Sequence, residues 1–215
     1  MSTPRTQLDE AFVALRKDLL NENGPQISTM RNYRFAIVPY SPRDEFKLRG
    51  KVQGLVSELT SGGWVVLTIS LQKLLLERVR KLGDNVVERL IENERSLGRD
   101  SPEKGLNYLS QKICNQIEGP DGIAADVCAE IKEFVEANPD KAERTLVIVG
   151  RAGSLFPFFR TSSLLKFVDG RTQNVPVVLL YPGERQGATG LSFMGVVPAD
   201  GDYRPRIYPL SLIHI

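Results

Sequence analysis

Two short runs of almost purely apolar residues constrain the fold of this chain more than any other feature of its sequence. One extends from Thr145 to Gly150 and the other from Val177 to Tyr181, and a glycine or a proline closes each of them. An unbroken apolar run of this length is typical of a strand that is covered on both faces. Such strands occur in parallel sheets with helices on both sides, so the runs predict an α/β fold.

The first half of the chain supplies further strands and most of the helices. Helical spacing of apolar residues predicts a first helix that ends near residues 21–24. Strands are expected at 35–38 and 64–69, and the helix between them begins at Ser41–Pro42, so the three elements predict a βαβ unit. Helical spacing then continues from residue 70 to residue 138, where glycine and proline breaks divide it into four helices.

The C-terminal part is expected to complete the sheet. A helix should begin at about Pro157, and two shorter strands are expected at 191–197 and 203–208, with Gly201–Asp202 as the turn between them. The predicted fold is therefore α/β, with a mostly parallel central sheet flanked by helices and a C-terminal antiparallel hairpin. A chain of 215 residues is too short for two domains of ordinary size, so a single domain over residues 1–215 is expected.

Several classes of activity are excluded or disfavoured by what the sequence lacks. Its single histidine, His214, is the second-last residue, which argues against nucleophile activation and proton transfer by imidazole. The two cysteines, Cys114 and Cys128, have no CxxC pattern, and no GxxxxGK[ST] loop is present, so neither a metal nor a nucleotide cofactor is expected. No signal peptide or spanning segment is found, and a cytoplasmic location without membrane attachment is expected.

Two functions other than protein binding stay open. Ligands of parallel sheets bind at the carboxyl ends of the strands, where Asp44, Arg151 and Glu184 would have to converge in an enzyme acting on phosphoryl groups or by hydrolysis. Weak DNA binding is ranked third, because 28 basic and 26 acidic side chains nearly cancel and the arginines are scattered. The arginines available for phosphate contacts are Arg151, Arg160, Arg171, Arg185, Arg204 and Arg206.

Aromatic residues beside arginines offer a recognition surface. The segment from Phe156 to Arg160 contains three phenylalanines, and it is either a core plug or an exposed anchor for a partner; Tyr203–Arg206 poses the same alternative. Aromatic and arginine side chains are enriched in interface hot spots. The residues predicted to bind a partner are Phe158, Phe159, Arg160, Glu184 and Arg185.

The chain also resembles a known family, through short segments in a fixed order. These are Ile37–Tyr40, Gly150–Pro157, Arg160–Leu165, Pro176–Gly183, Gly195 and Asp202–Arg204. They resemble the BrxB family, whose members are small components of the bacterial phage-defence systems called BREX, which mark host DNA by methylation and block phage replication. The Phe-Pro and Arg-Thr-Ser elements and the Pro182–Gly183 pair are the most specific of these segments.

The resemblance implies a function through partners. A PglZ-type protein of the alkaline-phosphatase superfamily is the first expected partner, followed by the BrxC ATPase and the PglX methyltransferase. The resemblance implies no catalytic residue, which agrees with the missing histidine and phosphate loop. A non-catalytic adaptor or regulator of a larger BREX enzyme is therefore the leading hypothesis. The family pattern is expected to end near Arg206–Ile207, so residues 211–215 are interpreted as a non-native tail.

Overall fold

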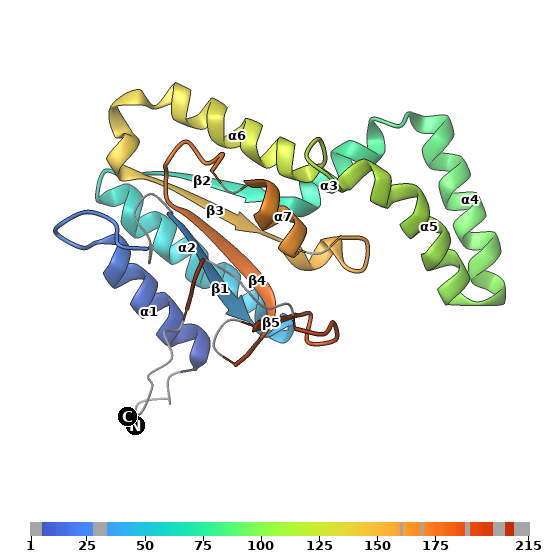
Figure 1. Ribbon diagram of the computed structural model, residues 1–215, viewed down its shortest axis with the longest axis horizontal. Coiled ribbons are helices and arrows are strands. Elements are labelled where there is room, and N and C mark those ends of the chain that lie inside the picture. Colours follow the sequence, from blue (N-terminus) through green and yellow to red (C-terminus); the bar gives the residue numbers. More distant parts are fainter. Residues whose placement is uncertain are drawn as a thin grey trace.

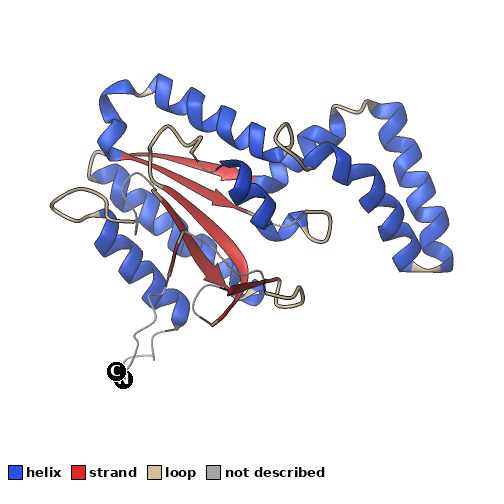
Figure 2. Ribbon diagram, in the orientation of Figure 1, coloured by secondary structure: helices blue, strands red, loops and turns tan. Residues whose placement is uncertain are grey.

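A central sheet lies between two layers of helices in the computed structural model (Figure 1, Figure 2). The structure describes residues 6–27, 34–159, 161–168, 170–187, 190–199 and 205–208. The strand order is β2-β3-β4-β1-β6, every pair in this path is parallel, and β5 pairs antiparallel with the end of β4. The predicted fold class is confirmed. The strands are β1 Phe35–Tyr40, β2 Val65–Ser70, β3 Thr145–Gly150, β4 Val177–Gln186, β5 Gly190–Phe193 and β6 Arg206–Ile207.

Two strand pairings differ from the sequence prediction. The antiparallel hairpin is present, but β4 and β5 form it, whereas β6 pairs parallel with β1. The predicted pairing of 191–197 with 203–208 is therefore wrong, and its turn, Gly201–Asp202, lies outside the described residues. The strand-helix-strand order at the start is confirmed, but β3 and β4 separate β1 from β2. Apolar periodicity identifies strands and carries no information about which strands become neighbours.

Alternation along each strand divides the core between the two faces of the sheet. Ala36, Val38 and Tyr40 of β1 pack with α1 and α2, whereas Phe35 and Ile37 pack with α3, α6 and α7. Both faces are apolar, which explains the unbroken apolar runs in β3 and β4. The helices of these layers are α1 Gln7–Leu19, α2 Glu45–Ser61, α3 Leu71–Arg80, α6 Ile123–Ala137 and α7 Thr161–Val168.

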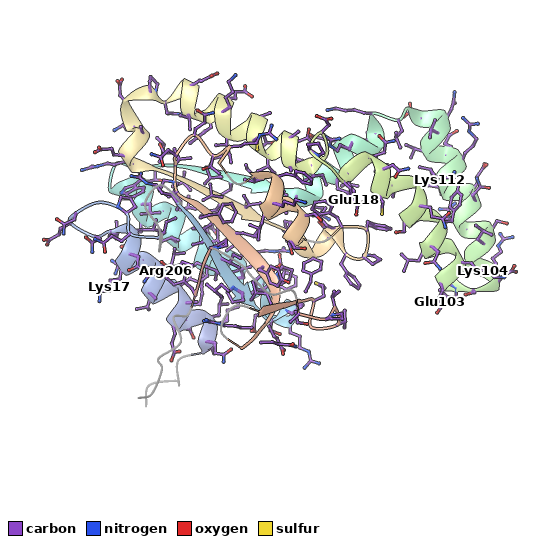
Figure 3. All side chains as sticks on the ribbon, in the orientation of Figure 1. Lys17, Glu103, Lys104, Lys112, Glu118 and Arg206 are labelled. Atoms are coloured by element: carbon purple, nitrogen blue, oxygen red, sulfur yellow. The ribbon has the colours of Figure 1, made fainter. Side chains whose placement is uncertain are left out.

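A helical hairpin projects from one end of the sheet, and we call it the arm. It consists of α4 (Asp84–Asp100) and α5 (Pro102–Ile117), so its length is about 25 Å at 1.5 Å per residue. Figure 3 shows Glu103 and Lys104 at its far end and Glu118 at its base. The two helices cross closely, because a Cβ on Gly105 would lie 3.0 Å from the Glu94 carbonyl oxygen. Leu90 is the one buried residue of α4, so the arm adds surface more than core.

Arg78 on α3 fixes the base of the arm. Its guanidinium forms an ion pair with Asp126 on α6 and donates to three backbone carbonyls, of Gln116 (2.8 Å), Asp121 (2.7 Å) and Gly122 (2.7 Å). Those carbonyls end α5 and form the turn into α6. One partly buried side chain thus joins three helices and supplies donors for carbonyls that the helix end leaves without an intrahelical partner.

Candidate functional site at the strand ends

The carboxyl ends of the strands meet around a small cleft. The helix after β1 covers one face of the sheet, while the segments after β2 and β3 cover the other, and ligand sites of parallel sheets lie where such connections diverge. The cleft has a volume of about 230 Å³. Its polar lining is Tyr40, Glu45, Gln72, Arg151 and Ser154.

Glu45, at the start of α2, is the centre of this cleft. The Tyr40 hydroxyl donates to one carboxylate oxygen at 2.6 Å, and Arg151 and Arg49 lie 3.1 Å and 3.4 Å from the other. Burial, and then the hydrogen bond to Glu45, raises the pKa of Tyr40 well above its usual range. Both oxygens of the Glu45 carboxylate therefore have partners. These contacts link β1, α2 and the loop after β3.

The loop after β3 contains a residue in a strained backbone conformation. Between Gly150 and Gly153, it is Arg151 that takes the left-handed conformation, with φ of 62°. The Ser154 hydroxyl donates to the Arg151 carbonyl at 2.7 Å and holds the turn. A Cβ on Gly153 would make an ordinary contact with the Met194 sulfur at 3.4 Å, so packing does not require a glycine at this position.

The residues of the enzyme hypothesis are not brought together in the cleft. Arg151 lines it, but neither Asp44 nor Glu184 does. Asp44 ends a short 3-10 helix, Pro42–Asp44, and Glu184 is exposed in the β4–β5 hairpin opposite Ser192. Sequence reasoning missed the ion pair between Glu45 and Arg151. Among the residues that the structure describes, no three His, Cys, Asp or Glu side chains are grouped to hold a metal ion.

A ring contact joins the loop after β3 to the β4–β5 hairpin. The rings of Phe156 and Phe193 are 6.1 Å apart, and Phe193 is opposite Gly183, the residue before Glu184. Phe156 is 36% exposed and Val196, in the turn after β5, is 70% exposed. We call the following group the strand-end surface: Phe156, Phe158, Glu184, Arg185, Met194 and Val196.

The predicted partner-binding residues differ in accessibility. Glu184 is exposed, and Phe158 and Arg185 are half-buried. Phe159 is 2% exposed, so its ring has a packing role in the core, and a contribution to partner binding stays a prediction. Arg160 lies outside the described residues. Sequence reasoning missed the exposure of Val196, because it placed this residue inside a strand at 191–197, whereas β5 ends at Phe193.

The arginines of the DNA hypothesis do not form one basic patch in the described part of the chain. Arg206 pairs with Asp18 at 3.0 Å and donates to the Gln26 carbonyl at 2.8 Å, so it ties β6 to α1 and the segment after it. Arg151 is paired with Glu45, whereas Arg171 is exposed beyond α7. Arg160 and Arg204 lie outside the described residues.

The two cysteines should react at different rates with thiol reagents. Cys114 is half-buried and its thiol lies 3.1 Å from the Phe158 carbonyl oxygen, whereas Cys128 is buried and burial raises its pKa. We expect iodoacetamide at pH 8 to modify Cys114 at least five-fold faster, measured by mass spectrometry over time. A Cys114→Ser variant should retain only the slow phase, and faster modification of Cys128 would contradict the burial order.

A protein-family model matches much of this chain. The model of the family described as BREX protein BrxB matches residues 67–207, about two thirds of the chain. The chain belongs to the BrxB family. It is therefore a component of BREX phage defence.

The matched residues of this BrxB protein include the arm, Arg151 and the strand-end surface. The segment Ile37–Tyr40, which also resembles the family, lies outside the matched residues. No curated protein and no solved structure matches the chain. In the described part of the chain, no helix has both the length and the apolar character needed to cross a membrane. Residues 211–215 lie outside the described residues.

Proposed function

We propose that this BrxB protein is a non-catalytic cytoplasmic subunit that binds a larger BREX enzyme through the strand-end surface. The PglZ-type protein is the first candidate partner, and the BrxC ATPase and PglX methyltransferase follow. The observation that carries the proposal is the contact between the rings of Phe156 and Phe193, which brings the loop after β3 and the β4–β5 hairpin into one surface with exposed apolar side chains.

The composition of the strand-end surface supports protein binding. Aromatic residues, Met and Arg are enriched in interface cores, and charged residues gather at the rim. Here the ring of Phe156 contacts that of Phe193 in β5, and the charged residues Glu184 and Arg185 lie on the paired strand β4. In the neighbouring cleft, Glu45 already accepts from Tyr40 and two arginines, which supports a structural role for the most polar group of the region.

A matched pair of valine variants tests this proposal. Size-exclusion chromatography with light scattering should show a joint peak of wild-type BrxB and the PglZ-type protein of its operon. Val196→Asp places a charge in the proposed interface and should weaken binding at least ten-fold by titration calorimetry. Val13→Asp makes the same change on α1, at a side chain that is 52% exposed, and should leave affinity unchanged.

The possible outcomes distinguish a wrong choice of interface from a wrong choice of partner. If both variants bind like the wild type, the strand-end surface is not the interface. Charge reversal by Arg160→Glu then tests the segment next to Phe159, and unchanged affinity would reject its predicted role as well. If the wild type binds neither the PglZ-type protein nor the BrxC ATPase nor the PglX methyltransferase at micromolar concentration, the adaptor function is contradicted.

A further inference from the structure

The outer edge of β2 carries hydrogen-bonding groups that no strand in the described part of the chain uses. β2 is the last strand in the sheet order, and among the described residues it pairs only with β3 (Figure 1). The Val147 amide donates to the Pro176 carbonyl at the β4 side, so alternate β3 residues point toward β2. The register Leu67↔Val147 then directs the backbone groups of Val66 and Thr68 away from the sheet.

β2 contains none of the residue types that usually block pairing at the edge of a sheet. Natural edge strands are blunted by lysines, prolines, bulges or short length. β2 has six residues, Val65–Ser70, and none of them is charged or proline. At the opposite edge, β6 has only two residues. The uncharged edge of β2 is therefore suited to accept another strand.

An apolar cleft continues this edge on the α2 side. Its volume is about 390 Å³, and Val52 and Val56 of α2 face Thr68 and Ile148 across it. Thr68 is exposed, and Val52 and Val56 are only partly buried. A strand beside β2 would direct every second side chain to this face of the sheet, where an apolar side chain would complete the packing between α2 and the strands.

The opposite face of β2 has acidic neighbours. α6 contacts β2 there and carries Glu130 and Glu133, and no ion pair joins either to a cation in the described part of the chain. Glu77 on α3 lies close to Glu130 and pairs with Lys73 at 3.7 Å. Side chains of an added strand that point to this face would meet a net negative charge.

We propose that β2 accepts an extended segment of another protein in which apolar side chains, directed to the α2 cleft, alternate with basic side chains, directed to α6. Backbone hydrogen bonds to Val66 and Thr68 would hold the segment, and the alternation would set its register. A second copy of this chain is disfavoured as the occupant, because its own β2 has no basic residue to offer Glu130 and Glu133. This inference is independent of the strand-end surface.

The test uses a nine-residue peptide that alternates valine and lysine, titrated into the ¹⁵N-labelled full chain and followed by amide chemical shifts. The amides of Val66 and Thr68 should shift with a dissociation constant of one millimolar or tighter. Thr68→Lys adds a charge to the edge and should weaken binding at least ten-fold, whereas Thr60→Lys, at an exposed threonine of α2, should have no effect.

A peptide of opposite charge and the oligomeric state of the chain distinguish the possible occupants of the β2 edge. A valine–glutamate peptide of equal length should bind at least ten-fold more weakly, and equal binding would overturn the charge assignment. Absence of shifts at Val66 and Thr68 with five millimolar valine–lysine peptide would overturn the docking proposal. If light scattering shows a dimer that Thr68→Lys dissociates, a second copy occupies the edge and the proposed partner chemistry is wrong.

Discussion

Replacing Arg78 with methionine should lower the free energy of unfolding of this protein by about 3 kcal/mol. The variant keeps an aliphatic chain in place, but it leaves the Asp126 carboxylate without its ion pair and three carbonyls without their donor. The side chains of Arg78 and Asp126 are only 19% and 25% exposed, so water compensates the lost bonds incompletely. Urea unfolding followed by circular dichroism measures the difference.

The control for Arg78 lies on the same helix. Lys73→Met removes a cation whose ion pair with Glu77 has side chains 70% and 40% exposed, and such surface pairs contribute less than about 1 kcal/mol. If Arg78→Met lowers the free energy of unfolding by no more than Lys73→Met does, the contacts at the base of the arm add little stability. Hydrogen exchange should also locate the lost protection in α5 and the start of α6.

The sequence was sufficient for the elements of the fold and insufficient for their pairing. The apolar runs at Thr145–Gly150 and Val177–Tyr181 are buried strands because both faces of the sheet are covered. β4, however, continues beyond Pro182 to Gln186, and its last residues pair with β5. The glycine that allows this extension also looks like a strand terminator in the sequence, so the hairpin was assigned to the wrong partners.

The candidate site shows a similar division. The sequence directed attention to the strand ends and to Arg151, which lines the cleft there, because that location follows from the fold class. It selected Asp44 where the structure uses Glu45, since neighbouring residues at a helix start point in different directions and the sequence does not fix the direction. It also grouped Phe158 with Phe159, although only the first is partly exposed. Local composition identifies a surface segment, but it does not show which of the side chains in that segment are exposed.

Gly183→Ala should have the second large effect, a loss of about 3 kcal/mol in the free energy of unfolding. A Cβ at this position would lie 2.1 Å from the Ser192 carbonyl oxygen and 2.7 Å from the Tyr181 ring. Tyr181 and Ser192 are 1% and 2% exposed, so neither can move into solvent without opening the β4–β5 ladder. Thermal and urea unfolding measure the loss, and hydrogen exchange should show faster exchange in β5.

Gly50→Ala is the matched control for Gly183→Ala, because a Cβ on Gly50 in α2 meets nothing within 4 Å and should stabilise the helix by about 0.5–1 kcal/mol. If the free energy of unfolding falls in Gly183→Ala and rises in Gly50→Ala, the loss in the first variant comes from close strand packing and not from the loss of a glycine in general. Since Gly183 holds Glu184 and Arg185 beside Phe193, the Gly183 variant should also bind the BREX partner more weakly at temperatures where it remains folded. Unchanged stability would mean that β5 can separate from β4 at no cost, and the strand-end surface would then lack the rigid support that partner binding through it requires.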